Sequence, residues 1–116
     1  MSHAIFSTEN SLKQYTWGDD CEGWNFVEEP ALSVKQERMP AGTAEHMHVH
    51  QHAGQFFFIL SGEAVFTIEN SESVVGPRQG IRILPGQAHR IRNAGTEPLE
   101  FLLISTPSTN NDRINL

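Results

Sequence analysis

Residues 42–62 read GTAEHMHVHQHAGQFFFILSG, and this stretch carries the strongest signal in the chain. Its first half places histidine at every second position, namely at His46, His48, His50 and His52. In an extended strand, side chains two residues apart point to the same side, so neighbouring histidines of this row can grip one ion. Imidazole is a common ligand for transition metals, and a tract this rich in histidine favours a metal site over solvated side chains.

The second half of the stretch, residues 55–60 (QFFFIL), is strongly strand-forming and runs into a hairpin signal. One face of this strand carries Gln55, Phe57 and Ile59, and the other carries Phe56, Phe58 and Leu60. Both faces are apolar, so we expect both to be covered. A barrel interior covers the first face. The N-terminal segment or a second subunit covers the other, and we expect a homodimer.

Further strands are predicted on both sides of this stretch, each ended by a turn signal. They span residues 31–39, 63–69, 81–84, 88–92 and 99–105. No window shows a convincing helical stripe, and residues 11–17 come nearest to one. Many short strands without helices between them predict an all-β antiparallel sandwich or barrel.

The length of 116 residues fits one compact domain. Within it we expect an N-terminal arm over residues 1–30 that packs on the barrel, the barrel itself over 31–106, and a polar tail over 107–116. The formal net charge is −6 and no run of Lys or Arg is present, which argues against nucleic acid or an anionic membrane as a partner. Neither a signal-peptide pattern nor a membrane-length apolar run is found, so the cytoplasm is the expected location.

Counted from Gly42, the opening stretch resembles the first motif of the cupin family, G-x5-H-x-H-x3,4-E-x6-G. His48, His50 and Gly62 match this motif. Gln55 stands where the family usually has Glu.

A later stretch, LPGQAHRIRN at residues 84–93, resembles the second cupin motif, P-x-G-x2-H-x3-N. Gly86, His89 and Asn93 are in register, while Leu84 takes the proline position. The resemblance extends over most of the chain, from about residue 17 to residue 114, and is greatest to a group of small bacterial cupins. In that group Gln commonly replaces Glu, and members are often labelled as mannose-6-phosphate-isomerase-like.

The resemblance implies a double-stranded β-helix, or jelly-roll, barrel that holds one divalent transition metal ion such as zinc, iron, manganese, nickel or copper. The ligands it implies are His48, His50, Gln55 and His89. Because Gln is neutral, it binds the ion more weakly than Glu and leaves the site more positive, which favours an anionic ligand. It also removes the usual general base from the ligand set. The remaining pair, His46 and His52, is expected at the rim, solvated or next to a ligand residue. If the strand stays extended past His50, His52 is the alternative to Gln55 as the fourth ligand.

Large apolar residues of the predicted strands are expected to line a pocket above the ion, or more simply to form the core. They include Phe57, Ile59, Phe66, Ile83, Ile91 and Phe101. The N-terminal aromatic residues Tyr15, Trp17 and Trp24 are expected to cover the outer face of residues 55–60 or the barrel end. Stacking on a sugar ring is the alternative.

The cupin fold alone does not decide the chemistry, because it hosts many unrelated reactions. One hypothesis is a metal-dependent enzyme that acts on a small sugar-like or anionic substrate, either isomerase-like, as the family label suggests, or a dioxygenase. The other hypothesis is a non-catalytic module that binds or senses a small molecule. The catalytic residues stay unknown at this stage.

Overall fold

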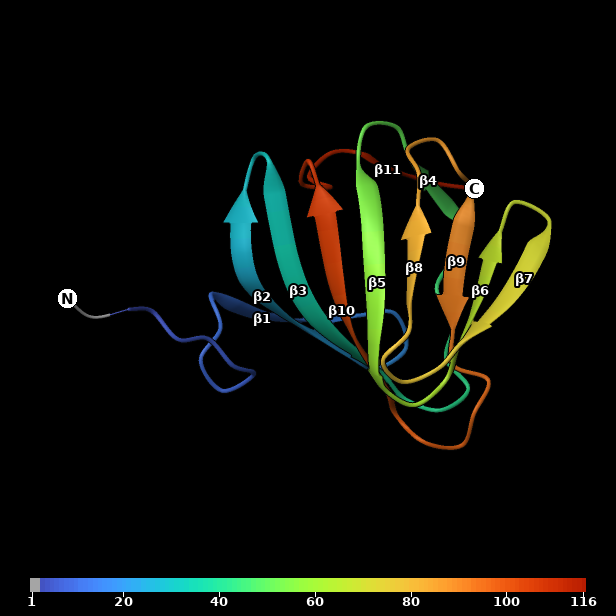
Figure 1. Ribbon diagram of the computed structural model, residues 1–116, viewed down its shortest axis with the longest axis horizontal. Coiled ribbons are helices and arrows are strands. Elements are labelled where there is room, and N and C mark those ends of the chain that lie inside the picture. Colours follow the sequence, from blue (N-terminus) through green and yellow to red (C-terminus); the bar gives the residue numbers. More distant parts are fainter. Residues whose placement is uncertain (1–2) are drawn as a thin grey trace.

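A computed structural model describes residues 3–116 as eleven β-strands in two facing antiparallel sheets (Figure 1). The larger sheet has the order β1-β2-β3-β10-β5-β8, with bounds Lys13–Trp17, Cys21–Glu29, Leu32–Met39, Leu99–Thr106, Gly54–Ser61 and Gly80–Ile83. The smaller sheet has the order β11-β4-β9-β6-β7, with bounds Arg113–Asn115, His48–His50, His89–Arg92, Ala64–Ile68 and Ser71–Val75. The predicted all-β jelly-roll barrel is confirmed.

The core lies between the sheets because every second side chain along each strand turns inward. In the pairing of β5 with β10, Ile59 stands opposite Phe101 and Phe57 stands opposite Leu103. Phe57 also meets Phe66 of the facing sheet edge to face, with ring centroids 5.0 Å apart, which is a favoured geometry for aromatic pairs. These buried contacts tie the two sheets together.

The inward row of β5 changes from apolar to polar at one end. Beyond Phe57, the side chain of Gln55 turns inward opposite Ser105 of β10, and both residues are buried. In the facing sheet, the buried residues of β4 are His48 and His50. The buried polar groups therefore share one end of the barrel, while the aromatic core fills the rest.

The six strands predicted outside the histidine row are confirmed to within one residue at each end; they are β3, β5, β6, β8, β9 and β10. Residues 11–17, which came nearest to a helical pattern, instead contain the whole of strand β1. Strands β2, β7 and β11 were not predicted. Strand β7 is a polar edge strand that pairs only with β6, so its sequence lacks the apolar alternation of a covered strand. Among the described residues, no helix has the length and apolar character needed to cross a membrane.

Both ends of the chain contribute strands to the sheets. The N-terminal segment supplies β1 and β2, and the tail supplies β11, which pairs with the histidine strand β4. In that pairing Arg113 stands opposite His50 and Asn115 opposite His48. The division of the chain at residues 30 and 106 stays a prediction.

The outward face of β5 is not covered by the N-terminal segment of the same chain. Phe56 and Leu60 on this face are 40% and 39% exposed. The residues before β1 run away from the barrel (Figure 1), and Ile5 and Phe6 among them are exposed. Of the two covers expected for this face, the described part of the N-terminal segment is not one.

Two motif glycines with positive φ allow a matched stability test. Gly42 and Gly62 have φ values of 79° and 85°, so alanine is strained at both. A Cβ at Gly62 would lie 2.7 Å from the carbonyl oxygen of Pro98, whereas a Cβ at Gly42 would meet nothing within 4 Å. We expect Gly42→Ala to lower the free energy of unfolding by about 1 kcal/mol. Gly62→Ala should cost clearly more, and equal losses in urea unfolding would contradict this difference.

Candidate metal centre

Three histidines meet at the polar end of the barrel. His48 and His50 alternate on β4, and His89 of β9 stands directly opposite His48 in the pairing of the two strands. The rings of His48 and His89 have centroids 4.2 Å apart. All three side chains are buried, and one nitrogen of each lies within 4.8 Å of the others. Buried imidazoles at this separation are the donor set of a metal site.

Backbone carbonyl groups orient two of the rings. The Nδ1–H of His48 donates to the carbonyl of His46 at 2.8 Å, and the Nδ1–H of His89 donates to the carbonyl of Gln87 at 2.9 Å. Each ring therefore turns its Nε2 lone pair toward the cluster, as metal-binding histidines commonly do. The buried Nδ1 of His50 has no hydrogen-bond partner among the described residues.

All three imidazoles are held in the neutral form. Burial lowers the pKa of His48 to about 3 and the pKa of His50 to about 4. Burial also lowers the pKa of His89 below its ordinary value. Neutral imidazole is the form that binds a metal ion, so the cluster does not have to lose protons near neutral pH.

The amide oxygen of Gln55 points at the same cluster. Its Oε1 lies 3.1 Å from Nε2 of His89, while its amide nitrogen donates to Oγ of Ser105 at 3.2 Å. Nε2 of His89 carries a lone pair because Nδ1 holds the proton. The two atoms are 3.1 Å apart, so Gln55 and His89 can both turn a lone pair toward the same point in the cluster.

The fold separates the other two histidines from this cluster. His46 and His52 are exposed on either side of β4. His46 contributes its backbone carbonyl to the His48 hydrogen bond, and His52 donates its backbone N–H to Asp112. Their side chains lie outside the group of three buried imidazoles.

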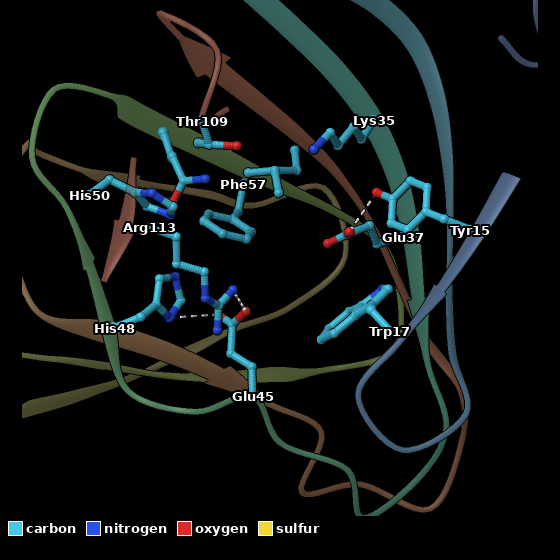
Figure 2. Close-up of a pocket in the computed structure, with 12 residues that line it drawn as sticks. Tyr15, Trp17, Lys35, Glu37, Glu45, His48, His50, Phe57, Thr109 and Arg113 are labelled. Atoms are coloured by element: carbon cyan, nitrogen blue, oxygen red, sulfur yellow. Dashed lines mark hydrogen bonds and ion pairs between the residues drawn. The ribbon is translucent and has the colours of Figure 1, made fainter. Parts of the chain in front are cut away.

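A cavity of about 270 Å³ opens beside the histidines (Figure 2), close in size to the lower end of small-molecule sites. It is lined by Tyr15, Trp17, Lys35, Glu37, Glu45, His48, His50, Gln55, Phe57, Leu103, Thr109 and Arg113. Of the apolar residues expected to line a pocket, Phe57 does so. The other five belong to the buried core; they are Ile59, Phe66, Ile83, Ile91 and Phe101.

Two of the three N-terminal aromatic residues lie in the wall of this cavity and not on the outer face of β5. Tyr15 and Trp17 line the cavity, because β1 folds back on β2 at the edge of the larger sheet. Sequence reasoning also missed the charged residues of the cavity wall, although the alternation of β3 turns Lys35 and Glu37 to the same side.

Glu45 and Arg113 form an ion pair at the edge of the histidine cluster. Nη1 of Arg113 lies 3.5 Å from Oε2 of Glu45, and Oε1 of Glu45 lies 3.9 Å from Nδ1 of His48 (Figure 2). Burial raises the pKa of Glu45 to about 8, although Arg113 opposes this shift. The C-terminal strand therefore brings a fixed positive charge to the cavity.

Asp112 holds the loop that joins the histidine strand to Gln55. Its carboxylate accepts hydrogen bonds from the backbone N–H groups of Gln51, His52 and Ala53, at 2.9 to 3.2 Å. Burial raises the pKa of Asp112, but the hydrogen bonds from Ala53 and His52 outweigh it and bring the pKa below its ordinary value. The tail thus fixes the chain between His50 and Gln55.

Replacing Asp112 by Asn tests the role of this loop. The amide keeps one acceptor oxygen and turns an N–H₂ group toward backbone N–H groups, so the loop between His50 and Gln55 should loosen. We expect metal affinity, measured by competition with a chelator, to fall about tenfold. The exposed carboxylate of Glu63 provides the control, and Glu63→Gln should leave the affinity unchanged. Equal affinities for Asp112→Asn and the wild type would contradict the proposed role of the tail.

Residues 35–105 match the family model of the cupin domain, and the chain therefore belongs to the cupin family. An uncharacterized protein of Methanocaldococcus jannaschii is 31% identical over 75 residues, which cover 65% of this chain and 60% of that protein. A mannose-1-phosphate guanylyltransferase of Escherichia coli is 29% identical over 82 residues, which cover 71% of this chain and 17% of the enzyme. This chain thus spans less than two thirds of either relative.

Solved structures share the whole fold. A double-stranded β-helix protein of Klebsiella pneumoniae superposes with a TM-score of 0.80 at 23% identity, covering 98% of this chain and 97% of that one. A predicted oxalate decarboxylase of Thermotoga maritima gives a TM-score of 0.81 at 20% identity, covering 91% of this chain and 100% of that one. At such identities the likeness establishes the fold and leaves the chemistry open.

Proposed function

We propose that this cupin is a metal-dependent enzyme that acts on a small anionic or sugar-like organic molecule, with His48, His50, Gln55 and His89 as the metal ligands. The observation that carries the proposal is the cluster of three buried imidazoles, with one nitrogen of each within 4.8 Å of the others. Oε1 of Gln55 lies beside it, 3.1 Å from Nε2 of His89. Ligand atoms that each lie about 2.1 Å from one ion, at roughly a right angle, are about 3 Å apart.

The donor set also fits a transition metal ion. Three neutral imidazoles and one amide oxygen suit zinc, iron, manganese, nickel or copper. A bound ion of this kind supplies a Lewis acid that polarises an oxygen of the substrate. Because no ligand is anionic, the ion keeps its full charge toward the cavity, which favours an anionic substrate. The ion pair of Glu45 with Arg113 supports the orientation of His48 and of the bound molecule.

The similar proteins support a small polar substrate. Their names include a mannose-1-phosphate guanylyltransferase and, among structures that share the fold, a sugar phosphate isomerase of Silicibacter pomeroyi. An oxalate-binding protein of Thermotoga maritima is 28% identical over 67 residues. This last likeness, together with the neutral Gln55 in place of an acidic ligand, favours a binding module as the second candidate function.

Metal analysis of protein purified without added metal tests the proposal. We expect roughly one ion per chain in the wild type and almost none in His48→Ala or His89→Ala, because each substitution removes one of the few ligands. His46→Ala is the matched control, since its side chain lies outside the cluster, and it should keep the ion. Loss of the ion in His46→Ala would mean that the ligands are assigned wrongly. Zinc as the sole metal would exclude a dioxygenase.

We further propose that the chain forms a homodimer through the outward face of β5. Phe56 and Leu60 are exposed there on a strand that lies between two others in the sheet, and a second copy would bury them. We expect light scattering to give the mass of a dimer at micromolar concentration, and Phe56→Glu with Leu60→Glu to give a monomer. Val74→Glu, at an exposed site of the edge strand β7, should leave the mass unchanged. A monomeric wild type would contradict the proposal.

A further inference from the structure

The cavity wall opposite the histidines is built by three adjacent strands. In the sheet register Tyr15 of β1, Gly23 of β2 and Glu37 of β3 stand side by side. A Cβ at Gly23 would collide with the Tyr15 ring, so only glycine leaves room for the ring to lie across β2. The Tyr15 hydroxyl therefore reaches Glu37 and donates to its Oε2 at 2.6 Å. Figure 2 shows this pair facing His48 and His50 across the cavity.

Of the two carboxyl groups that line the cavity, only that of Glu37 has an oxygen without a hydrogen-bond partner in the described part of the chain. Both oxygens of Glu45 are engaged, since Oε1 accepts from the N–H of Ile91 at 3.3 Å and Oε2 accepts from Arg113 at 3.5 Å. Oε1 of Glu37 has no hydrogen-bond partner among residues 3–116 and points toward the middle of the cavity (Figure 2). This oxygen can therefore accept a hydrogen bond from a ligand that brings a donor.

The two ends of the cavity differ in charge and hydrogen bonding. At the histidine end, an ion on neutral ligands and the guanidinium of Arg113 present positive charge. At the other end, the carboxyl group of Glu37 presents an acceptor, and Lys35 on the same wall adds a positive charge beside it. Burial raises the pKa of Glu37, while the Tyr15 hydrogen bond, Lys35 and Arg113 oppose the shift. Burial and the neighbouring Glu37 raise the pKa of Tyr15, so its hydroxyl keeps the proton that it donates.

We propose that the cavity selects a small hydroxy acid, with its carboxylate at the histidine end and its hydroxyl group donating a hydrogen bond to Glu37. This inference rests on the proposed function, because the carboxylate end requires the bound ion. Glu37 determines the specificity, and Tyr15 is a positioning residue that holds its carboxylate. Where Glu37 is ionised, a second carboxylate placed beside its free oxygen would meet like charge, so the cavity favours a hydroxyl group over a second carboxylate there.

The test uses three acids that differ only in the group at the far end: propionate, β-hydroxypropionate and malonate. Metal-loaded protein is titrated by calorimetry at mildly alkaline pH, since burial raises the pKa of Glu37. We expect the wild type to bind β-hydroxypropionate about tenfold more tightly than propionate, as a hydrogen bond to a charged group implies. In Glu37→Gln the ratio of malonate to β-hydroxypropionate affinity should shift about tenfold toward malonate, because the amide carries no charge.

Comparing these ratios removes the part of each affinity that comes from binding the ion itself. The same series with one more methylene, namely butyrate, γ-hydroxybutyrate and succinate, covers a longer distance between the two ends. Tyr15→Phe keeps the ring and removes only the donor. Its ratio of malonate to β-hydroxypropionate affinity should therefore lie between the ratios of the wild type and Glu37→Gln. Glu29→Gln removes an exposed carboxylate at the end of β2 and should keep the wild-type ratio.

Three results would overturn the inference: no preference of the wild type for the hydroxy acid in either series, an unchanged ratio in Glu37→Gln, or an equal shift in Glu29→Gln. Circular dichroism and metal content, measured on each variant, show that fold and ion are retained. A wild type without bound ion would overturn the proposed function itself. A metal-loaded wild type that does not discriminate would overturn only the inference about the hydroxy acid.

Discussion

The pairing of β4 with β9 is the contact on which the candidate site depends, because it sets His48 directly opposite His89. A register slip of one residue would turn His89 to the outer face and disperse the cluster. Strand β4 is only three residues long, so it needs support from elsewhere. Strand β11 pairs with the other edge of β4, and the carboxylate of Asp112 accepts hydrogen bonds from the backbone just after β4. The last residues of the chain thus stabilise the strand that carries two of the histidines.

Burial has opposite consequences for the two kinds of titratable group at this end of the barrel. It lowers the pKa of the histidines and keeps them neutral, as metal binding requires. It raises the pKa of Glu37 and Glu45, so carboxyl groups in the cavity carry charge only with support from neighbours. Arg113 opposes the shift at Glu45, whose pKa still rises to about 8. One oxygen of Glu37 accepts a hydrogen bond from the Tyr15 hydroxyl, and the other oxygen is free. A donor group on the ligand can therefore bind at that end.

How far the sequence predicts the structure follows from what each strand packs against. Strands such as β5 and β10, covered on the inner face by the core, show long apolar runs and were predicted nearly to the residue. Strand β1 and the edge strand β7 are largely exposed, and their polar sequences lack that pattern. Strand β11 is wholly exposed as well, and it forms because β4 offers an unpaired edge. The sequence pattern of a strand reflects which of its side chains are buried, so it says little about strands that are mostly exposed.

The sequence by itself determined the barrel and the histidine row, because alternation along a strand and the spacing from Gly42 to Gly62 are local properties that survive in a one-dimensional pattern. The three buried imidazoles and the inward turn of Gln55 agree with that pattern. Only the tertiary structure decided what faces them. Tyr15 meets Glu37 because two strand pairings align both residues with Gly23, and Arg113 enters the cavity because β11 pairs with β4. Such contacts depend on register between distant segments, which no local spacing encodes.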